Sequence, residues 1–477
     1  MSPASPTLRF RRRGCAGAGL FALALLAGGC AHAPQNLPLA AGGPAADYRY
    51  PVGARPAGRS GLMAALFFSG GGTRAAALSY GVLRELAATP LPGGGRMLDD
   101  VTTINAVSGG SFTAAYYCLY GDRIFADYEQ LFLKRNVQDI LVARCLTPVN
   151  TVRLWSSRFG RSDLAAEYYD ELLFHGATFG DLARLGPDRP YLVINATNIA
   201  TGASLQFTQQ QFDQIGSDLS RFPIARAVAA SSAVPLLFSP IILKNYADRV
   251  PPAGAIAPPP AEAPDIFASF RDALAETSRT YRDVENHPYI DLMDGGLSDN
   301  LALRNLLNQV TLAGGWDAVL GRLRGQGITK LAIVVVNAAV EGEQPWARDD
   351  RAPGLKAVVS SLSNSSIIRA NRETLAMVET SLALWQRERA ARGPAAGTPP
   401  KVYFIRVDLR SAADPAERAF FESVPTRFHL PPATVDRLVQ GGRLLLRESP
   451  EFQRLLRDLE ADRPRMTAEV GATKEKE

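Results

Sequence analysis

The sequence holds few of the residues from which metal and redox sites are built. Among 477 residues there are four cysteines and four histidines, with no Cys-x-x-Cys pair and no cluster of cysteine with histidine. This scarcity excludes the common sequence patterns of zinc-binding and dithiol proteins, and we predict no metal and no organic cofactor. Cys118 and Cys145 lie well inside the chain, and they can pair only in an oxidising compartment and at a suitable Cα separation.

The sequence also has little excess charge once its first residues are set aside. The formal net charge is +5, and residues 1–29 contain four arginines and no acid. The chain from Cys30 onward therefore carries a net charge of +1. A nucleic-acid-binding protein usually concentrates positive charge in a strong patch, so we predict that nucleic acid is not a partner.

The N-terminal apolar stretch, residues 15–29, is too short for a membrane-spanning helix. It follows the basic segment RFRRRG, an order typical of an export signal. Its end, LLAGGC, resembles a bacterial lipoprotein signal in which Cys30 becomes lipidated, although Ala27 stands where leucine is usual; the alternative is an ordinary cleaved signal. We expect residues 1–29 to be the signal peptide and acylated Cys30 to anchor the protein to the membrane. Ala31, which is not aspartate, favours the outer membrane of the bacterial envelope, facing the periplasm.

Composition divides the rest of the chain. Residues 30–60 are rich in Ala, Pro and Gly and predict a flexible tether. One domain is expected over residues 61–465, with a low-complexity surface excursion at 251–264. The polar tail, residues 466–477, is expected to be disordered. The oligomeric state is left open.

Apolar runs alternate with helix-like segments along the predicted domain. Five runs predict strands: Leu62–Phe68, Val101–Val107, Tyr191–Thr197, Leu331–Ala338 and Val402–Leu409. The run Leu331–Ala338 is almost entirely apolar, as expected for a strand buried on both faces. The alternation predicts an α/β fold with a mostly parallel sheet covered by helices.

A candidate nucleophile follows the second of these runs. The segment AVSGG places Ser108 between Ala106 and Gly110, where a strand candidate gives way to a helix candidate. A nucleophile elbow needs small side chains two positions before and after the serine, because its backbone is strained and neighbouring chains pass close. Ala106 replaces the usual first glycine. Taken alone, this pattern also fits an ordinary turn.

A glycine loop follows the first strand candidate in the segment FFSGGGTRAAA. Gly70, Gly71 and Gly72 can present backbone amides to an oxyanion, and the following helix start adds partial positive charge. Arg74 either braces this loop or adds positive potential. A phosphate cradle is the rival interpretation, but neither of the common phosphate-loop patterns is present.

A candidate base lies in YIDLMDGGLSDN. Asp294 follows a short apolar strand and precedes two glycines, so it can reach into a site and orient or deprotonate Ser108. In isolation it equally fits a turn aspartate.

Together, and in this order, the three segments resemble the patatin-like phospholipase family; RAVAASSAVPLLFSPI and INATNIATG resemble further segments of that family. The resemblance implies a three-layer α/β/α fold and hydrolysis of acyl esters, mainly of lipids. It implies Ser108 as nucleophile, Asp294 as base, and an oxyanion hole from the glycine loop and Arg74. Departures from the family pattern stand at three positions, none of them a reacting group: Ser69, Ala75 and Ala106.

Two alternatives stay open from the sequence. His429 would complete a serine, aspartate, histidine order, although the DGG context favours a two-residue dyad. The substrate is expected to be a lipid or another acyl ester; the alternatives are an esterase or thioesterase on non-phospholipid substrates, and a catalytically silent lipid-binding envelope protein.

Overall fold

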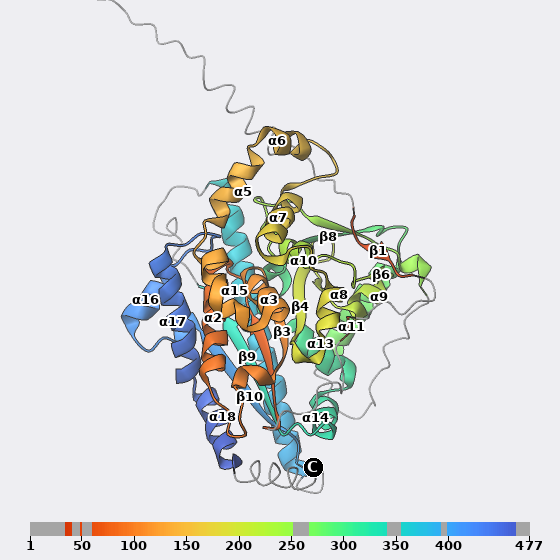
Figure 1. Ribbon diagram of the computed structural model, residues 1–477. Helices are drawn as coiled ribbons and strands as arrows, with labels where there is room; N and C mark the ends of the chain where they lie inside the picture. The colour runs from red at the N-terminus through yellow and green to blue at the C-terminus, as the bar shows by residue number, and fades with distance from the viewer. Residues whose placement is uncertain are drawn as a thin grey trace, which may run out of the picture.

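An eight-stranded sheet forms the centre of the protein (Figure 1). The computed structural model describes residues 34–40, 48–49, 60–250, 267–340, 354–392 and 398–463. The predicted signal peptide, Cys30, the excursion at 251–264 and the tail at 466–477 lie outside these residues.

The strand order is β10-β9-β2-β3-β4-β8-β7, with β5 also paired to β4. Pairing is parallel from β10 through β4 and antiparallel for β5, β7 and β8. The strands are β2 (Leu62–Phe68), β3 (Val101–Val107), β4 (Tyr191–Asn198), β5 (Ser204–Gln206), β7 (Ile241–Lys244), β8 (Tyr289–Asp294), β9 (Lys330–Asn337) and β10 (Lys401–Asp408). The five predicted strands are confirmed to within one residue at each end, and so is the mostly parallel α/β class.

Alternate side chains of β2 separate the two faces of the sheet. Leu66 and Phe68 pack into one apolar cluster with helices α2 (Gly72–Ala88), α3 (Gly109–Tyr120), α10 (Ile224–Ser231), α17 (Pro432–Glu448) and α18 (Pro450–Ala461). Ala65 and Phe67 pack into a second cluster with α13 (Arg304–Ala313), α14 (Trp316–Gly325) and α15 (Leu355–Arg392). Because both faces are covered, the central strands are apolar throughout, and the fold is a three-layer α/β/α sandwich.

The remaining helices lie mostly around the ends and edges of this sandwich. They are α4 (Ile124–Tyr128), α5 (Val137–Cys145), α6 (Pro148–Leu154), α7 (Arg161–Tyr169), α8 (Phe179–Leu185), α9 (Gln209–Gln214), α11 (Ala268–Arg282), α12 (Gly296–Asp299) and α16 (Pro415–Ser423).

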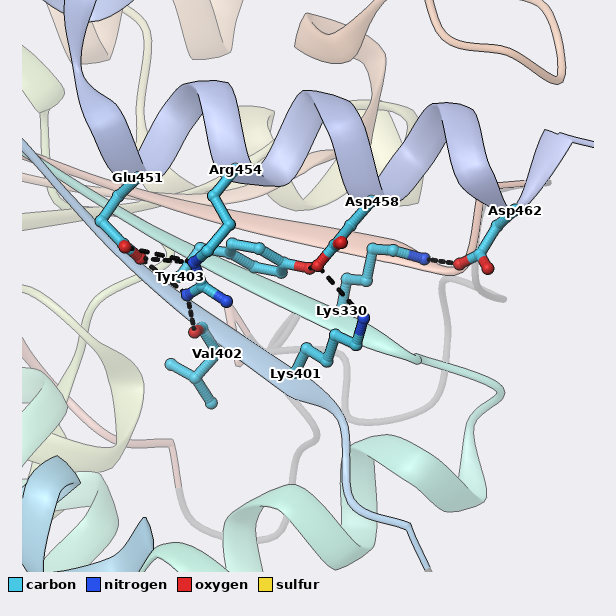
Figure 2. A network of polar contacts seen from close by, with 8 residues as sticks. All are labelled: Lys330, Lys401, Val402, Tyr403, Glu451, Arg454, Asp458 and Asp462. Carbon is cyan, nitrogen blue, oxygen red and sulfur yellow. Dashed lines mark hydrogen bonds and ion pairs between the residues drawn. The ribbon is translucent and has the colours of Figure 1, made fainter.

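The C-terminal helix α18 binds the edge strand β10 and its neighbour β9 through a network of polar contacts (Figure 2). The network joins residues of β9 and β10 with residues of α18: Lys330, Lys401, Val402, Tyr403, Glu451, Arg454, Asp458 and Asp462. The Tyr403 hydroxyl donates to Asp458 Oδ2 at 2.6 Å, and this bond lowers the pKa of the Asp458 carboxyl. Arg454 donates to the Val402 carbonyl at 3.0 Å and lies over the Tyr403 ring. The network holds β10 against β9, and β9 in turn lies beside β2, which leads into the glycine loop.

Within the segment that the sequence predicts as a tether, residues 30–60, the described stretches contact the domain. Leu37 and Pro38 form β1, which pairs with β6 (Ser217–Asp218). Tyr48 is buried, and its hydroxyl accepts a hydrogen bond from the Leu192 amide at 2.7 Å. These residues are held because buried polar groups and an aromatic ring find partners on the domain, which Ala/Pro/Gly composition does not reveal.

Cys118 and Cys145 are both free thiols. Cys118 is buried in α3, and burial raises the pKa of its thiol well above the ordinary value.

Candidate active site

Ser108 occupies a strained turn between β3 and α3. Its φ is 50° and its ψ is −122°, a conformation that residues other than glycine rarely adopt. A non-glycine residue is held in such a conformation only when the surrounding structure imposes it, and such residues gather at functional sites. Ser108 therefore has the backbone of a nucleophile elbow rather than of an ordinary turn.

The residues around Ser108 are small because the backbone of the glycine loop passes close to them. A Cβ on Gly110 would lie 2.7 Å from the Ser69 carbonyl oxygen, and one on Gly109 would lie 2.1 Å from the Gly72 carbonyl oxygen. Ala106 is fully buried and its methyl group is accommodated. The elbow thus presses against the glycine loop, which explains the requirement for small side chains at this turn.

Asp294 and Ser108 lie at the ends of two strands on either side of β4, and their side chains contact each other near the end of β4. In the sheet register Val107 pairs with Asn195, and Ala196 pairs with Asp294, so β4 separates the serine strand from the aspartate strand. The Ser108 hydroxyl donates to Asp294 Oδ2 at 2.8 Å. Both side chains are largely removed from water, with Ser108 4% and Asp294 8% exposed.

The second oxygen of Asp294 is also bonded. Oδ1 accepts from the Gly296 amide at 2.8 Å. A Cβ on Gly295 would lie 2.3 Å from the Asn195 carbonyl oxygen, so the glycine allows Asp294 to approach the sheet end. Burial raises the pKa of Asp294 to about 6, and the bonds from Gly296 and Ser108 only partly offset that effect. The carboxylate is therefore ionised at neutral pH but is a stronger base than an ordinary aspartate.

The glycine loop differs from the expectation at its first residue. The Gly70 amide donates to the Asn300 carbonyl at 3.1 Å, so it is not available to an oxyanion in this arrangement. Gly71, with φ of 141°, and Gly72, with φ of 60°, carry amides that bind no acceptor among the described residues. Gly71 directly precedes α2 and Gly72 is its first residue, so both amides lie at the helix N-terminus. Backbone amides there have no partner within the helix and can bind an anion.

Arg74, in the first turn of α2 directly after the glycine loop, binds two segments that lie far along the chain. Its guanidinium donates to Ala338 O at 2.8 Å, to Val424 O at 2.5 Å and to Thr426 Oγ1 at 2.9 Å. Burial lowers the pKa of Arg74 to about 10, so the group keeps its charge at neutral pH. All three guanidinium nitrogens are used in these bonds, so the structure favours a role in holding the start of α2 in place over direct contact with an oxyanion.

We expect Arg74→Lys to be nearly as impaired as Arg74→Gln, with kcat lowered by about 10-fold or more in each, because an ammonium group cannot reproduce the planar fork. The kcat of both variants on a soluble ester, together with their thermal unfolding, tests this. If lysine restored the activity that glutamine removes, the charge rather than the brace would be what matters.

One polar side chain that the sequence patterns did not single out, Ser231, completes the site together with backbone carbonyls. The Ser108 amide donates to Ser231 Oγ at 2.8 Å, and Ser231 Oγ donates to the Asn195 carbonyl at 2.6 Å. The Asp294 amide donates to the Ala233 carbonyl at 3.0 Å. The end of α10 therefore fixes both members of the pair; the segment RAVAASSAV was a usable signal, but it gave no indication of which serine would do this.

His429 does not join the pair. Both Asp294 oxygens are bonded to Gly296 and Ser108, and His429 Nδ1 is buried without a hydrogen-bond partner among the described residues. The hydrogen bonds of the described residues therefore join Ser108 to Asp294 and include no bond from His429 to either of them. Nowhere in the described ranges do three or more His, Cys, Asp or Glu side chains gather in a way that could hold a metal ion. Within the same ranges, the helices are all too short or too polar to cross a membrane.

The fold and the site define an α/β protein with a buried serine and carboxylate at the ends of its sheet strands. A family model described as patatin-like phospholipase matches residues 66–307, which is half of the chain and includes Ser108, Asp294 and the glycine loop. The chain belongs to the patatin-like phospholipase family. The expectation of a patatin-like α/β/α fold is thereby confirmed.

Solved structures with low sequence identity also align with the chain. Human GIVD cytosolic phospholipase A2 aligns with a TM-score of 0.44 and 12% identity, covering 85% of this chain and 61% of that chain. VipD from Legionella pneumophila aligns with a TM-score of 0.29 and 14% identity, covering 80% of this chain and 66% of that chain. The chain thus spans about three fifths of the length of the human protein. A search of curated proteins gave no match.

Proposed function

We propose that this protein is a membrane-anchored serine lipid acyl hydrolase, a patatin-like phospholipase A or esterase. The observation that carries the proposal is the 2.8 Å hydrogen bond from Ser108 Oγ to Asp294 Oδ2, made by a serine held at positive φ. Membership of the patatin-like phospholipase family supports a lipid as the source of the acyl ester.

The proposed reaction begins with attack of Ser108 Oγ on the ester carbonyl carbon, while Asp294 takes the hydroxyl proton. The carbonyl oxygen becomes an oxyanion, and the amides of Gly71 and Gly72 with the start of α2 stabilise it. The bond to the leaving alkoxide breaks, and Asp294 returns its proton to that oxygen. Water then attacks the carbonyl carbon of the acyl-serine while Asp294 takes a proton from it. The bond from that carbon to Ser108 Oγ breaks, Asp294 returns the proton to Oγ, and the fatty acid leaves.

A fluorophosphonate probe tests the nucleophile directly. In this proposal detergent-solubilised, folded protein is labelled on Ser108, and no label appears on Ser108→Ala. Absence of label on folded wild-type protein would favour the catalytically silent lipid-binding alternative. Activity confined to soluble short-chain esters or thioesters would favour the non-phospholipid alternative.

We also propose that Cys30 is lipidated and that it anchors the protein to the outer membrane, facing the periplasm. The support is the basic stretch, the apolar run and the small residues before Cys30. In cells fed an alkyne fatty acid, we expect the wild-type chain to incorporate it and Cys30→Ser to lose the label completely. Equal labelling of the two proteins would reject lipidation at this residue.

A further inference from the structure

Helices α5 and α6 expose an unusual run of apolar side chains. We call it the α5–α6 surface, and its members are Val142, Leu146, Val149, Val152 and Trp155, each between 57% and 70% exposed. Val142 lies on α5, Val149 and Val152 lie on α6, and Leu146 and Trp155 directly follow these two helices. Five large apolar side chains exposed within fourteen consecutive residues mark an interaction surface rather than scattered exposure.

The same segment carries a concentration of positive charge. Residues 134–161 contain six lysines and arginines and a single acid, a net charge of +5, whereas the whole chain from Cys30 onward carries +1. Three of the six pair with acids outside the segment: Lys134 with Glu129 and Asp436, Arg144 with Glu171, and Arg153 with Glu167. Arg135 and Arg158 are exposed and have no acidic partner within the described ranges. An apolar surface flanked by arginine complements an interface of acyl chains and anionic headgroups.

The α5–α6 surface lies at the end of the molecule where the catalytic pair is found. Figure 1 shows α6 and α5 at the top of the view, with α7, α10 and α3 below them in turn, and these helices pack on one another in that order. Arg161 at the start of α7 donates to the Leu236 carbonyl at 3.1 Å. Leu236 and Leu237 are themselves more than half exposed, and Leu236 has φ of 69°. They lie three and four residues beyond Ala233, which accepts the Asp294 amide.

We infer that the α5–α6 surface, together with Leu236 and Leu237, docks the protein onto an anionic lipid bilayer. Trp155 and the valines enter the boundary between headgroups and acyl chains, and Arg135 and Arg158 contact the phosphates. Docking there brings the end of the sheet that holds Ser108 toward the lipids. The choice of a bilayer as partner rests on the proposed function, but docking is a separate property from hydrolysis and can be measured without it.

Sedimentation with vesicles tests the inference in the full chain carrying Cys30→Ala, so that no acyl anchor contributes. The surface variant adds Val149→Ser, Val152→Ser and Trp155→Ser. The matched control adds Leu312→Ser and Leu444→Ser, which remove exposed leucines on α13 and α17. The vesicles are phosphatidylcholine, alone or mixed with phosphatidylglycerol. Hydrolysis of a soluble ester reports whether the site of each variant is intact.

We expect partitioning of the surface variant onto mixed vesicles to fall by about 10-fold or more, with ester hydrolysis unchanged and the control unaffected. Arg135→Gln with Arg158→Gln is expected to weaken binding to mixed vesicles while leaving binding to phosphatidylcholine alone unchanged.

Equal partitioning of the surface variant and its parent would overturn the inference. So would a surface variant that binds vesicles normally but converts a self-associated parent into monomers, because the surface would then join two copies of the chain. If the parent bound vesicles through this surface but hydrolysed no ester and took up no fluorophosphonate, the proposed function would fail and the docking surface would stand.

Discussion

Ser108→Ala is expected to abolish hydrolysis, with kcat lowered by at least about 10⁴-fold on both a soluble ester and vesicle phospholipid. The substitution removes the atom that attacks the substrate's ester carbonyl in the proposed reaction. It also removes the hydrogen bond to Asp294 Oδ2, but the oxygens of Asp294 keep the Gly296 amide as a partner. Steady-state kinetics of purified protein measures the effect.

A buried serine elsewhere supplies the control for Ser108→Ala. Ser79 lies buried in α2, and its hydroxyl has no hydrogen-bond partner in the part of the chain that is described. Ser79→Ala is expected to keep wild-type kinetics and an equal or higher unfolding temperature, because it deletes an unsatisfied polar group. If Ser108→Ala kept more than about a tenth of wild-type kcat while Ser79→Ala behaved normally, Ser108 would not be the nucleophile.

Asp294→Asn is expected to lower kcat by about 10³-fold or more, because an amide occupies the same space but cannot take the serine proton. The wild-type enzyme is expected to show kcat/KM rising with pH through about 6 and reaching a plateau above it. The direction follows from the pKa of Asp294, which burial raises to about 6, since only the ionised carboxylate acts as base. The residual activity of Asp294→Asn is expected to lack this rise.

The raised pKa also has a consequence for stability. Asp294 binds its proton more tightly in the folded protein than at its ordinary pKa of 3.8, so its ionised form disfavours folding. This free-energy cost of folding is absent below about pH 3.8 and reaches its full size above about pH 6. The difference between the two pKa values of Asp294 corresponds to about 3 kcal/mol. Urea unfolding at pH 8 is therefore expected to show Asp294→Asn more stable than wild type, although it is inactive. Lower stability of this variant at pH 8 would contradict the burial argument.

Two control variants separate Asp294 from its neighbours. Asp299 is also buried with a raised pKa, but its oxygens accept from the amides of Leu303 and Arg304 rather than from Ser108. We expect Asp299→Asn and His429→Ala to stay within about 10-fold of wild-type kcat. A loss of several orders of magnitude in folded His429→Ala would replace the dyad by a triad.

The strands on either side of the catalytic serine were predictable from local patterns. Leu62–Phe68 is a continuous apolar run and Val101–Val107 is rich in β-branched residues, and each is followed by small residues where the chain turns. Three glycine-containing segments could also be recognised in the sequence: the glycine loop, the serine segment and the DGG segment. Each needs small residues within a few positions, because neighbouring backbone passes close to it. The short antiparallel strands β5 and β7 were missed, because three or four residues carry too little pattern to identify a strand.

The hydrogen-bond partners of the functional groups could not be predicted from local sequence patterns. Gly70 was expected to offer its amide to an oxyanion, but Asn300, 230 positions later, takes that amide. Arg74 left two roles open until its guanidinium was seen to bind carbonyls of Ala338 and Val424. Such contacts depend on where distant loops meet, and a hydrogen bond between remote segments leaves no periodicity in the sequence.

Local sequence patterns were enough to predict the α/β class, the candidate nucleophile and the candidate base, because each depends on residues close together in the chain. The export signal rests on the same kind of pattern and stays a prediction. The structure adds that Ser108 and Asp294 lie within hydrogen-bond distance and that Ser231 accepts a bond from the serine amide. It also shows His429 Nδ1 without a hydrogen-bond partner among the described residues. The physical reason for this difference is that local sterics and burial act over a few residues, whereas a catalytic geometry is fixed by strand register and by packing between segments more than a hundred positions apart.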